Sequence, residues 1–181
     1  MRITFANTFD FVRAARFAPR VAGCGIALAL VLSGCALPVN VAPGMPASQV
    51  IAALGQPTAR YTLPNGGQRL QYSQAPMGRR VYNVDLDAQG RAVGVEQALD
   101  ETLFSRRIAI NHWTRDDVLR EYGPPMRAMT VHNFDGQIWV WRYYDPLAEP
   151  YRLYIDVDRG NIVRGYSTVD ESLLLGGRGR R

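Results

Sequence analysis

The chain has no lysine, only two cysteines and only two histidines among its 181 residues, so all 21 basic residues are arginines. From Cys35 onward, 17 arginines face 15 acidic residues, and the arginines are scattered along the chain. A protein that binds nucleic acid usually concentrates its basic residues on one face. The charge pattern therefore argues against DNA or RNA as a partner.

Residue types that catalyse reactions or hold metals are scarce. His112 and His132 are the only histidines, and no Gly-x-Ser-x-Gly or His-x-x-x-His motif occurs. The Asp-x-Asp stretches at 85–87 and 156–158 lack the further oxygen ligands of a calcium loop, so we interpret them as hairpin turns. We predict a non-catalytic protein without metal or other cofactor. A hydrolase site built from His112 and dispersed Ser or Asp residues is the enzymatic alternative.

A hydrophobic run long enough to cross a membrane is also missing. The N-terminus instead has arginines at 13, 16 and 20, an uncharged segment Val21–Leu32 and the small pair Ser33-Gly34, which is the layout of a secretory signal. An uncleaved transmembrane helix is the alternative. It would need about 20 apolar residues, whereas the strongly apolar segment has roughly a dozen and is flanked by glycine and proline.

The sequence Leu32-Ser33-Gly34-Cys35 resembles the lipobox of bacterial lipoproteins. This resemblance implies a signal peptide at 1–34, diacylglycerol on the Cys35 thiol and an acyl group, such as palmitate, on the new amino terminus. Ala36 follows the modified cysteine, and in lipoprotein sorting the lack of Asp there favours the outer membrane, on its periplasmic side, over the inner membrane. Because Cys24 lies in the leader, the mature chain has no disulfide.

The mature chain contains an internal repeat. The segment 50–57 recurs at 118–125, with Val, Gly and Pro in the same places 68 residues later. Residues 82–87 then align with 153–158 at an offset of 71, each with alternating apolar and acidic or polar positions. Self-similarity in this order indicates two copies of one supersecondary unit.

We predict an α+β fold of two tandem modules, at 44–98 and 99–170, each a short helical pair packed on a three-stranded antiparallel meander. Helices should end at Gly55 and Gly123, and Thr114 with Asp117 should form a capping box. A further helix is predicted over 100–110. The predicted strands are 68–74, 82–87, 91–97, 137–144, 153–157 and 162–168. Residues 35–43 should form a tether and 171–181 a disordered Gly/Arg tail, and whether the modules share one sheet stays open.

These motifs resemble the SmpA/OmlA, or BamE-like, family of outer-membrane lipoproteins. The resemblance rests on 44–50 (Gly-Met-Pro-Ala-Ser-Gln-Val), 54–57 (Leu-Gly-Gln-Pro) and the strand pair Trp141-x-Tyr143. It implies an accessory role in outer-membrane protein assembly or envelope integrity, with the β-barrel assembly machinery as the implied partner. The doubled module also resembles the fold of β-lactamase inhibitor protein, which implies instead an inhibitor-like, periplasmic protein-binding module.

Aromatic residues crowd the second module. The candidate partner-binding surface consists of Trp139, Trp141, Tyr143, Tyr144 and Tyr154. Tyr and Trp dominate the energetics of protein interfaces, so we expect a protein partner in the envelope. The alternative is that these side chains form the core and the packing between the modules.

The lipobox makes a testable prediction about the mature N-terminus. Mass spectrometry of the membrane-extracted protein should find Cys35 as the first residue, carrying acyl chains, because signal cleavage precedes that cysteine. A mature chain that still begins at Met1 without lipid would contradict the prediction.

Overall fold

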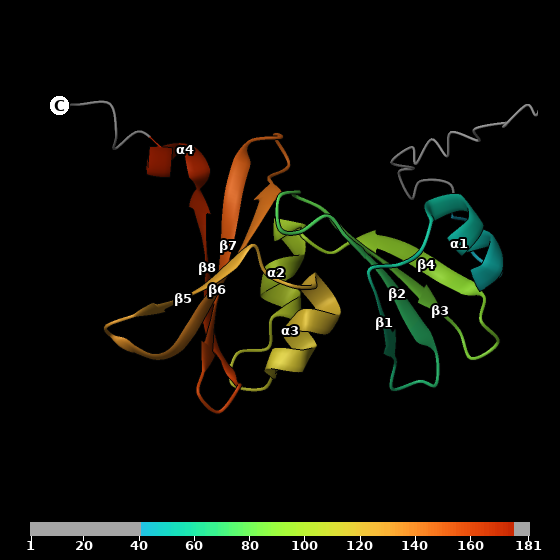
Figure 1. Cartoon of the computed structure of the whole chain (residues 1–181), viewed down its shortest axis with the longest axis horizontal. Coiled ribbons are helices and arrows are strands. Elements are labelled where there is room, and N and C mark those ends of the chain that lie inside the picture. Colours follow the sequence, from blue (N-terminus) through green and yellow to red (C-terminus); the bar gives the residue numbers. More distant parts are fainter. Residues whose placement is uncertain (1–40, 176–181) are drawn as a thin grey trace, which may run out of the picture. The chain divides into compact units, whose positions relative to one another are not determined.

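The computed structural model describes residues 41–175 (Figure 1). The signal peptide predicted at 1–34, the predicted lipid-attachment residue Cys35, most of the predicted tether and residues 176–181 lie outside the described residues. Val41, at the end of the tether, is 8% exposed and packs into the first hydrophobic core. Within 41–175, none of the helices has the length and hydropathy needed to span a membrane.

The two modules contain twelve helices and strands. The first consists of α1 (Ala47–Leu54), β1 (Ala59–Thr62), β2 (Gln68–Ser73), β3 (Val81–Leu86) and β4 (Ala92–Gln97). The second consists of α2 (Glu101–Arg107), α3 (Arg115–Tyr122), β5 (Arg127–Val131), β6 (Phe134–Tyr144), β7 (Pro150–Asp158), β8 (Val163–Asp170) and α4 (Glu171–Leu175). Each set of four strands forms its own antiparallel sheet in chain order, so the modules do not share a sheet (Figure 1).

The prediction of three-stranded meanders with helical pairs was wrong. Each sheet has a fourth strand, β1 or β5, and the first module has α1 alone. Both missed strands are short edge strands that follow the helix directly, and their side chains are half-buried or exposed. They therefore lack the apolar alternation that marked the other strands. The segment before α1 bonds to β4, with Gly44 N donating to Ala92 O at 2.7 Å.

The hydrogen bonds repeat between the modules, as the sequence repeat predicts. Ala47 N donates to Gly90 O at 2.9 Å, and Arg115 N donates to Asn161 O at 2.8 Å. The residue before each helix, Pro46 or Thr114, forms an isolated bridge to the start of the last strand of its own module. Both sheets also have a register shift at the same place, at 85/86 and 156/157. The repeated unit is therefore one helix followed by four strands, and the second module adds α2 before this unit and α4 after it.

The predicted helix ends are present, with one difference. Thr114 and Asp117 form the capping box of α3, and Gly55 and Gly123 follow α1 and α3 with φ of 83° and 66°. Their ψ values are extended, so these glycines turn the chain directly into a strand and are not left-handed helical caps. A side chain at such a φ would be strained. The helix expected over 100–110 is shorter and ends at Arg107.

The predicted turns also form. Asp87 Oδ1 accepts hydrogen bonds from Gln89 N at 2.9 Å and Arg91 N at 2.8 Å, and Asp158 Oδ1 accepts from Ile162 N at 2.9 Å. These carboxylates thus satisfy backbone N–H groups of the hairpins that join β3 to β4 and β7 to β8. The tail predicted to begin at residue 171 is ordered at its start, because residues 171–175 form α4.

Each module has its own hydrophobic core. The first lies between α1 and one face of its sheet, and its buried residues are Val41, Val50, Leu70, Val84, Leu86 and Ala92. The second lies between α2, α3 and the inner face of the second sheet, where Phe104 packs edge-on against Tyr122 and Tyr143 at centroid distances of 5.9 and 5.3 Å. Val81 and Ala98 of the first module also belong to this second core, together with Leu99, the first residue after that module.

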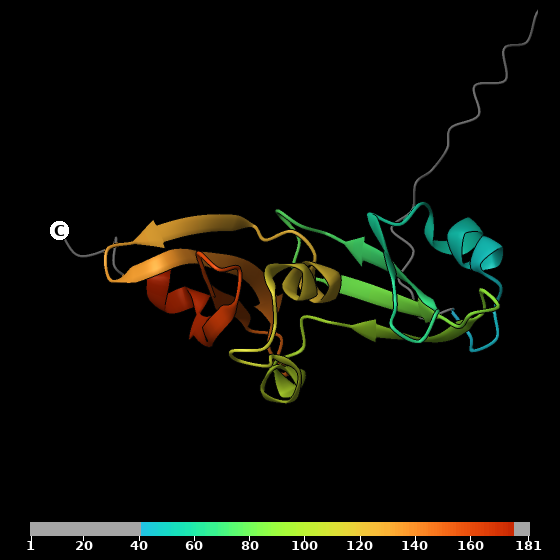
Figure 2. The same ribbon diagram turned by 90° about the horizontal axis from the view of Figure 1, so that it is seen from below.

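The other face of the first sheet covers the C-terminal end of α3 (Figures 1 and 2). Gln71 Nε2 donates to the carbonyls of Leu119 and Arg120 at 3.3 and 3.1 Å, and Asn83 Nδ2 donates to the Glu121 carbonyl at 2.9 Å. The last carbonyls of a helix have no partner within it. Side chains of the first module therefore cap a helix of the second, which explains why Gln71 and Asn83 are buried.

Charged side chains surround this junction. Arg69 forms a bidentate ion pair with Asp85, with N–O distances of 2.7 and 2.8 Å, and also bonds Glu121 at 2.5 Å. Glu121 in turn pairs with Arg107, which contacts Glu96 at 2.5 Å. Burial opposes the charged form of Arg69, but the bonds from Asp85 and Glu121 outweigh it and raise the pKa of Arg69. Two arginines and three carboxylates thus join the modules.

The second core makes a testable prediction about stability. Trp141 is 1% exposed and stacks against Tyr122 and Trp139. Trp141→Ala should lower the free energy of unfolding by about 3–5 kcal/mol, because it leaves a cavity. Tyr144→Ala, at a 46% exposed position on the same strand, is the matched control and should cost about 1 kcal/mol or less. Urea denaturation measures both, and equal losses would contradict the assignment of Trp141 to the core.

Candidate functional site

The five aromatic residues of the predicted partner-binding surface lie on two different faces. Trp139, Trp141 and Tyr143 alternate along β6 on the inner face and are 3%, 1% and 0% exposed. Tyr144 and Tyr154 lie on the outer face, the first exposed and the second half-buried. The structure therefore brings three of them together within the core, and the five do not form one continuous surface.

A groove of about 820 Å³ lies at one end of the second module. Three segments form it: the tip of the β5–β6 hairpin, the turn between β7 and β8, and the first residue of α3. Its lining is mostly polar. The lining side chains that carry charge, a hydrogen-bonding group or an aromatic ring include Arg115, His132, Asn133, Asp135, Gln137, Trp139 and Arg159.

Trp139 links this groove to the core. The Arg115 guanidinium lies 5.2 Å from the centre of the Trp139 ring, and Trp139 Nε1 donates to Gln137 Oε1 at 3.1 Å. An arginine over an indole face is held by the ring quadrupole. Because Trp139 is fixed by core packing, Arg115 and Gln137 are held in position by a rigid support.

The hairpin tip and the opposite turn are tied across the groove. Arg159 Nε pairs with Asp135 Oδ1 at 2.6 Å, and Arg159 N donates to Asp135 O at 3.2 Å. Both side chains are more than 70% exposed, so the ion pair contributes little stability. It does place one charge of each sign at the groove edge, where a bound polar chain could contact both.

The two histidines lie in separate turns. His132 lies in the turn between β5 and β6 and lines the groove, whereas His112 lies in the turn before α3. Over residues 41–175, no group of three His, Cys, Asp or Glu side chains is arranged to hold a metal ion. The groove therefore offers hydrogen bonds, charge and the aromatic rings of Phe134 and Trp139, which are the means of binding a polar ligand.

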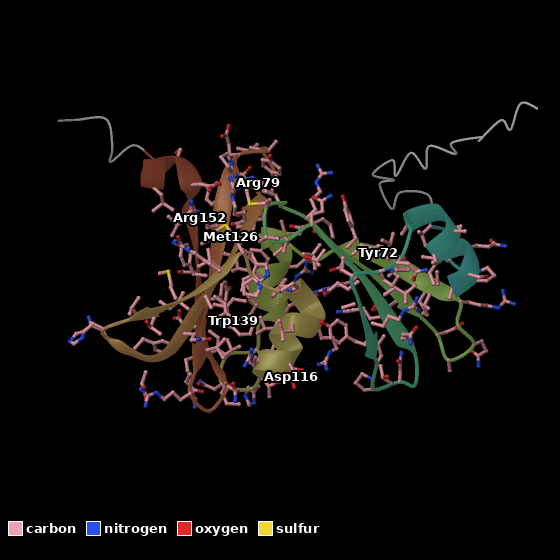
Figure 3. The ribbon with its side chains drawn as sticks, viewed as in Figure 1. Tyr72, Arg79, Asp116, Met126, Trp139 and Arg152 are labelled. Carbon is pink, nitrogen blue, oxygen red and sulfur yellow. The ribbon has the colours of Figure 1, made fainter. Side chains whose placement is uncertain are left out.

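A second charged cluster was not expected from the sequence. Glu171, the first residue of α4, is 5% exposed and contacts three arginines. Arg142 of β6 approaches it at 3.1 Å and Arg152 of β7 at 2.8 Å, while Arg79 reaches it from the loop between β2 and β3 of the first module. Figure 3 shows Arg79 and Arg152 at the same end of the second sheet. We call Arg79, Arg142 and Arg152 the arginine triad.

The triad changes the acidity of Glu171. Burial alone would raise the pKa of this carboxyl, but the hydrogen bonds from Arg79, Arg152 and Arg142 outweigh it and lower the pKa to about 2. No local signal in the sequence indicates this arrangement, because Glu171 precedes a Gly/Arg segment and the arginines are 92, 29 and 19 residues away. Only the strand register and the contact between modules bring them together.

Comparisons with known proteins give little further information. No protein-family model and no curated protein matches the chain. The osmotically inducible lipoprotein OsmE is 22% identical, over 44% of this chain and 90% of that chain, with a TM-score of 0.32. The DUF4309 family protein YjgB of Bacillus subtilis is 18% identical, over 68% and 76%, with a TM-score of 0.27. At TM-scores this low, neither likeness supports an argument about fold or function.

The lowered pKa of Glu171 predicts a pH dependence of stability. A carboxyl whose pKa is lower in the folded state stabilises the protein above its ordinary pKa of 4.5, and the stabilisation is lost as the pH falls from there towards 2. Urea midpoints of the wild type and of Glu171→Gln should therefore differ at pH 6 and converge towards pH 2. A difference that stays constant over this range would contradict the prediction.

Proposed function

We propose that the chain is a lipid-anchored cell-envelope protein that binds a protein partner without catalysis, through the groove at the end of its second module. The lipobox ending at Cys35 supports the anchor, and Ala36 favours the periplasmic side of the outer membrane. The observation that carries the binding role is the groove itself, with Arg115 stacked on a core tryptophan. Its volume is within the range of ligand-binding clefts, roughly 300–1,000 Å³.

The chemistry of the groove suits an extended polypeptide. Arg and Trp are the residue types most enriched at the energetic centres of protein interfaces, and here they form one supported pair. Thr130 and Val131 of β5 also line the groove, and β5 is an edge strand of the second sheet. The outer backbone groups of an edge strand can pair with an added strand. A partner segment with an acidic side chain near Arg115 would use both features.

Two kinds of partner follow from the sequence resemblances. The likeness of residues 44–57 to the SmpA/OmlA family favours an accessory role in outer-membrane protein assembly or envelope integrity. The doubled module favours, as the second candidate, an inhibitor-like function toward a soluble periplasmic protein. Both functions need a binding surface and neither needs a reactive centre, so the groove serves either one.

A pull-down with the lipid-anchored protein tests the proposal. Arg115→Ala combined with Asn133→Ala should lower recovery of the specific partner at least about ten-fold, since a hot-spot residue contributes about 2 kcal/mol or more. Both residues are exposed, and loss of the contact between Arg115 and Trp139 costs about 1 kcal/mol or less, so the thermal midpoint should fall only slightly. Recovery of the β-barrel assembly machinery would support the first candidate, and recovery of a soluble periplasmic enzyme the second.

Arg106→Ala supplies the matched control, because Arg106 is an exposed arginine on α2 and is not among the groove-lining residues. It should leave recovery at the wild-type level. If the double variant and this control recover equal amounts of the same partner, the groove is not the binding site.

A further inference from the structure

Within residues 41–175, two clusters of ion-paired side chains differ in how many arginines and carboxylates they contain. The cluster at the module junction has two arginines and three carboxylates, Asp85, Glu96 and Glu121. The second cluster has the three arginines of the triad and only the Glu171 carboxylate. All three triad side chains are at most 25% exposed. Three arginines against one carboxylate leave the second cluster with an excess of two positive charges. Such an excess is unfavourable where the charges are largely buried, because buried charges need partners.

The fold imposes this excess. Arg142 and Arg152 are direct cross-strand partners on β6 and β7, and like charges in that position destabilise a sheet. Arg79 then adds a third guanidinium, with Nη1 donating to Tyr143 O at 3.3 Å and Cζ lying 5.0 Å from the centre of the Tyr144 ring. An anion between the three groups offsets their repulsion, and the Glu171 carboxylate supplies one.

The guanidinium groups also have more donors than Glu171 uses. Each arginine carries five N–H donors. Glu171 accepts hydrogen bonds from one nitrogen of Arg79 and from two each of Arg142 and Arg152. Guanidinium groups match the planar geometry of carboxylates and bind phosphates in the same bidentate way. The triad can therefore bind an oxyanion that has more charge and more oxygens than one carboxylate.

Glu171 is held on a weakly stabilised element. The α4 helix has five residues, and a helix of that length is not stable without tertiary contacts. Leu173 and Leu174 contribute little, because they are 72% and 44% exposed. The ion pairs of Glu171 fix the start of α4 against β6 and β7.

We propose that the arginine triad is an oxyanion-binding site, for a carboxylate or phosphate group, and that Glu171 occupies it as a tethered ligand. An external oxyanion binds by displacing the Glu171 side chain, and α4 then leaves the sheet. The chain thereby couples binding at the triad to release of its C-terminal segment. This site is distinct from the groove, so it stands independently of the proposed function.

Replacing Glu171 by Gln removes the carboxylate from the triad, so that binding of an added anion there can be measured. The probes are inorganic phosphate and, separately, glutarate, each compared with chloride at equal ionic strength on the full chain. Glu171→Gln should melt at a lower temperature than the wild type, and phosphate or glutarate should raise its midpoint by at least about 2 °C more than chloride does, since a ligand of the folded state stabilises it. The two probes distinguish phosphate from carboxylate recognition.

Two variants control this experiment. Glu121→Gln also removes a buried carboxylate with two arginine partners, but Asp85 and Glu96 remain there, so phosphate should give it no extra stability. Combining Glu171→Gln with Arg142→Gln should abolish the anion effect. Equal responses of the Glu171 and Glu121 variants, or an anion effect that survives loss of Arg142, would overturn the proposal.

Hydrogen exchange on the wild type tests the displacement without any substitution. Phosphate should speed exchange of the backbone amides of residues 172–174 at least about three-fold, because displaced Glu171 no longer fixes α4. The amides of β6 should not respond. Unchanged exchange in α4 at phosphate concentrations that stabilise Glu171→Gln would show that the anion does not displace the helix and would contradict the proposal.

Discussion

The C-terminal end of α3 is the point on which the arrangement of the two modules depends. Its last carbonyls must find donors, and these come from Gln71 and Asn83 on the polar face of the first sheet. A carbonyl buried at this junction without a donor would cost about 1–3 kcal/mol, which Gln71 and Asn83 prevent, and separating the modules would expose the apolar residues at 81, 98 and 99 to water. The first module thus supplies hydrogen-bond donors to α3 and apolar residues to the core of the second module.

This junction also determines where charge can accumulate. Because the loop between β2 and β3 is held beside the second sheet, Arg79 contacts the same carboxylate as Arg142 and Arg152. These two arginines are cross-strand neighbours on β6 and β7. At the junction itself, carboxylates outnumber arginines, and the charges stabilise contact between the modules. At the triad the ratio is reversed. The same repeat therefore supports one cluster suited to joining modules and one suited to holding an anion.

Much of each module could be predicted from local sequence. Thr114 with Asp117 specifies the start of α3, and the glycines at 55 and 123 end the helices, because capping depends on residues a few positions apart. The strands β3 and β7 followed from period-two alternation. The strands β1 and β5 did not, because an edge strand is stabilised by pairing with its neighbour and needs no apolar run of its own. Residues that line the groove, such as Arg115, were missed for a similar reason, since the contact of Arg115 with Trp139 joins different elements.

The sequence by itself determined the helix ends and the hairpin turns, which depend on residues close together in the chain, and the internal repeat, which needs only a comparison of one segment with another. The tertiary structure alone decided that Trp139, Trp141 and Tyr143 are buried while Tyr144 is exposed, since both faces of β6 are apolar or aromatic in sequence. The tertiary structure also forms the groove and brings the three arginines of the triad together. Their members are up to 92 residues apart, and only strand register and the packing of one module on the other bring such residues within contact distance.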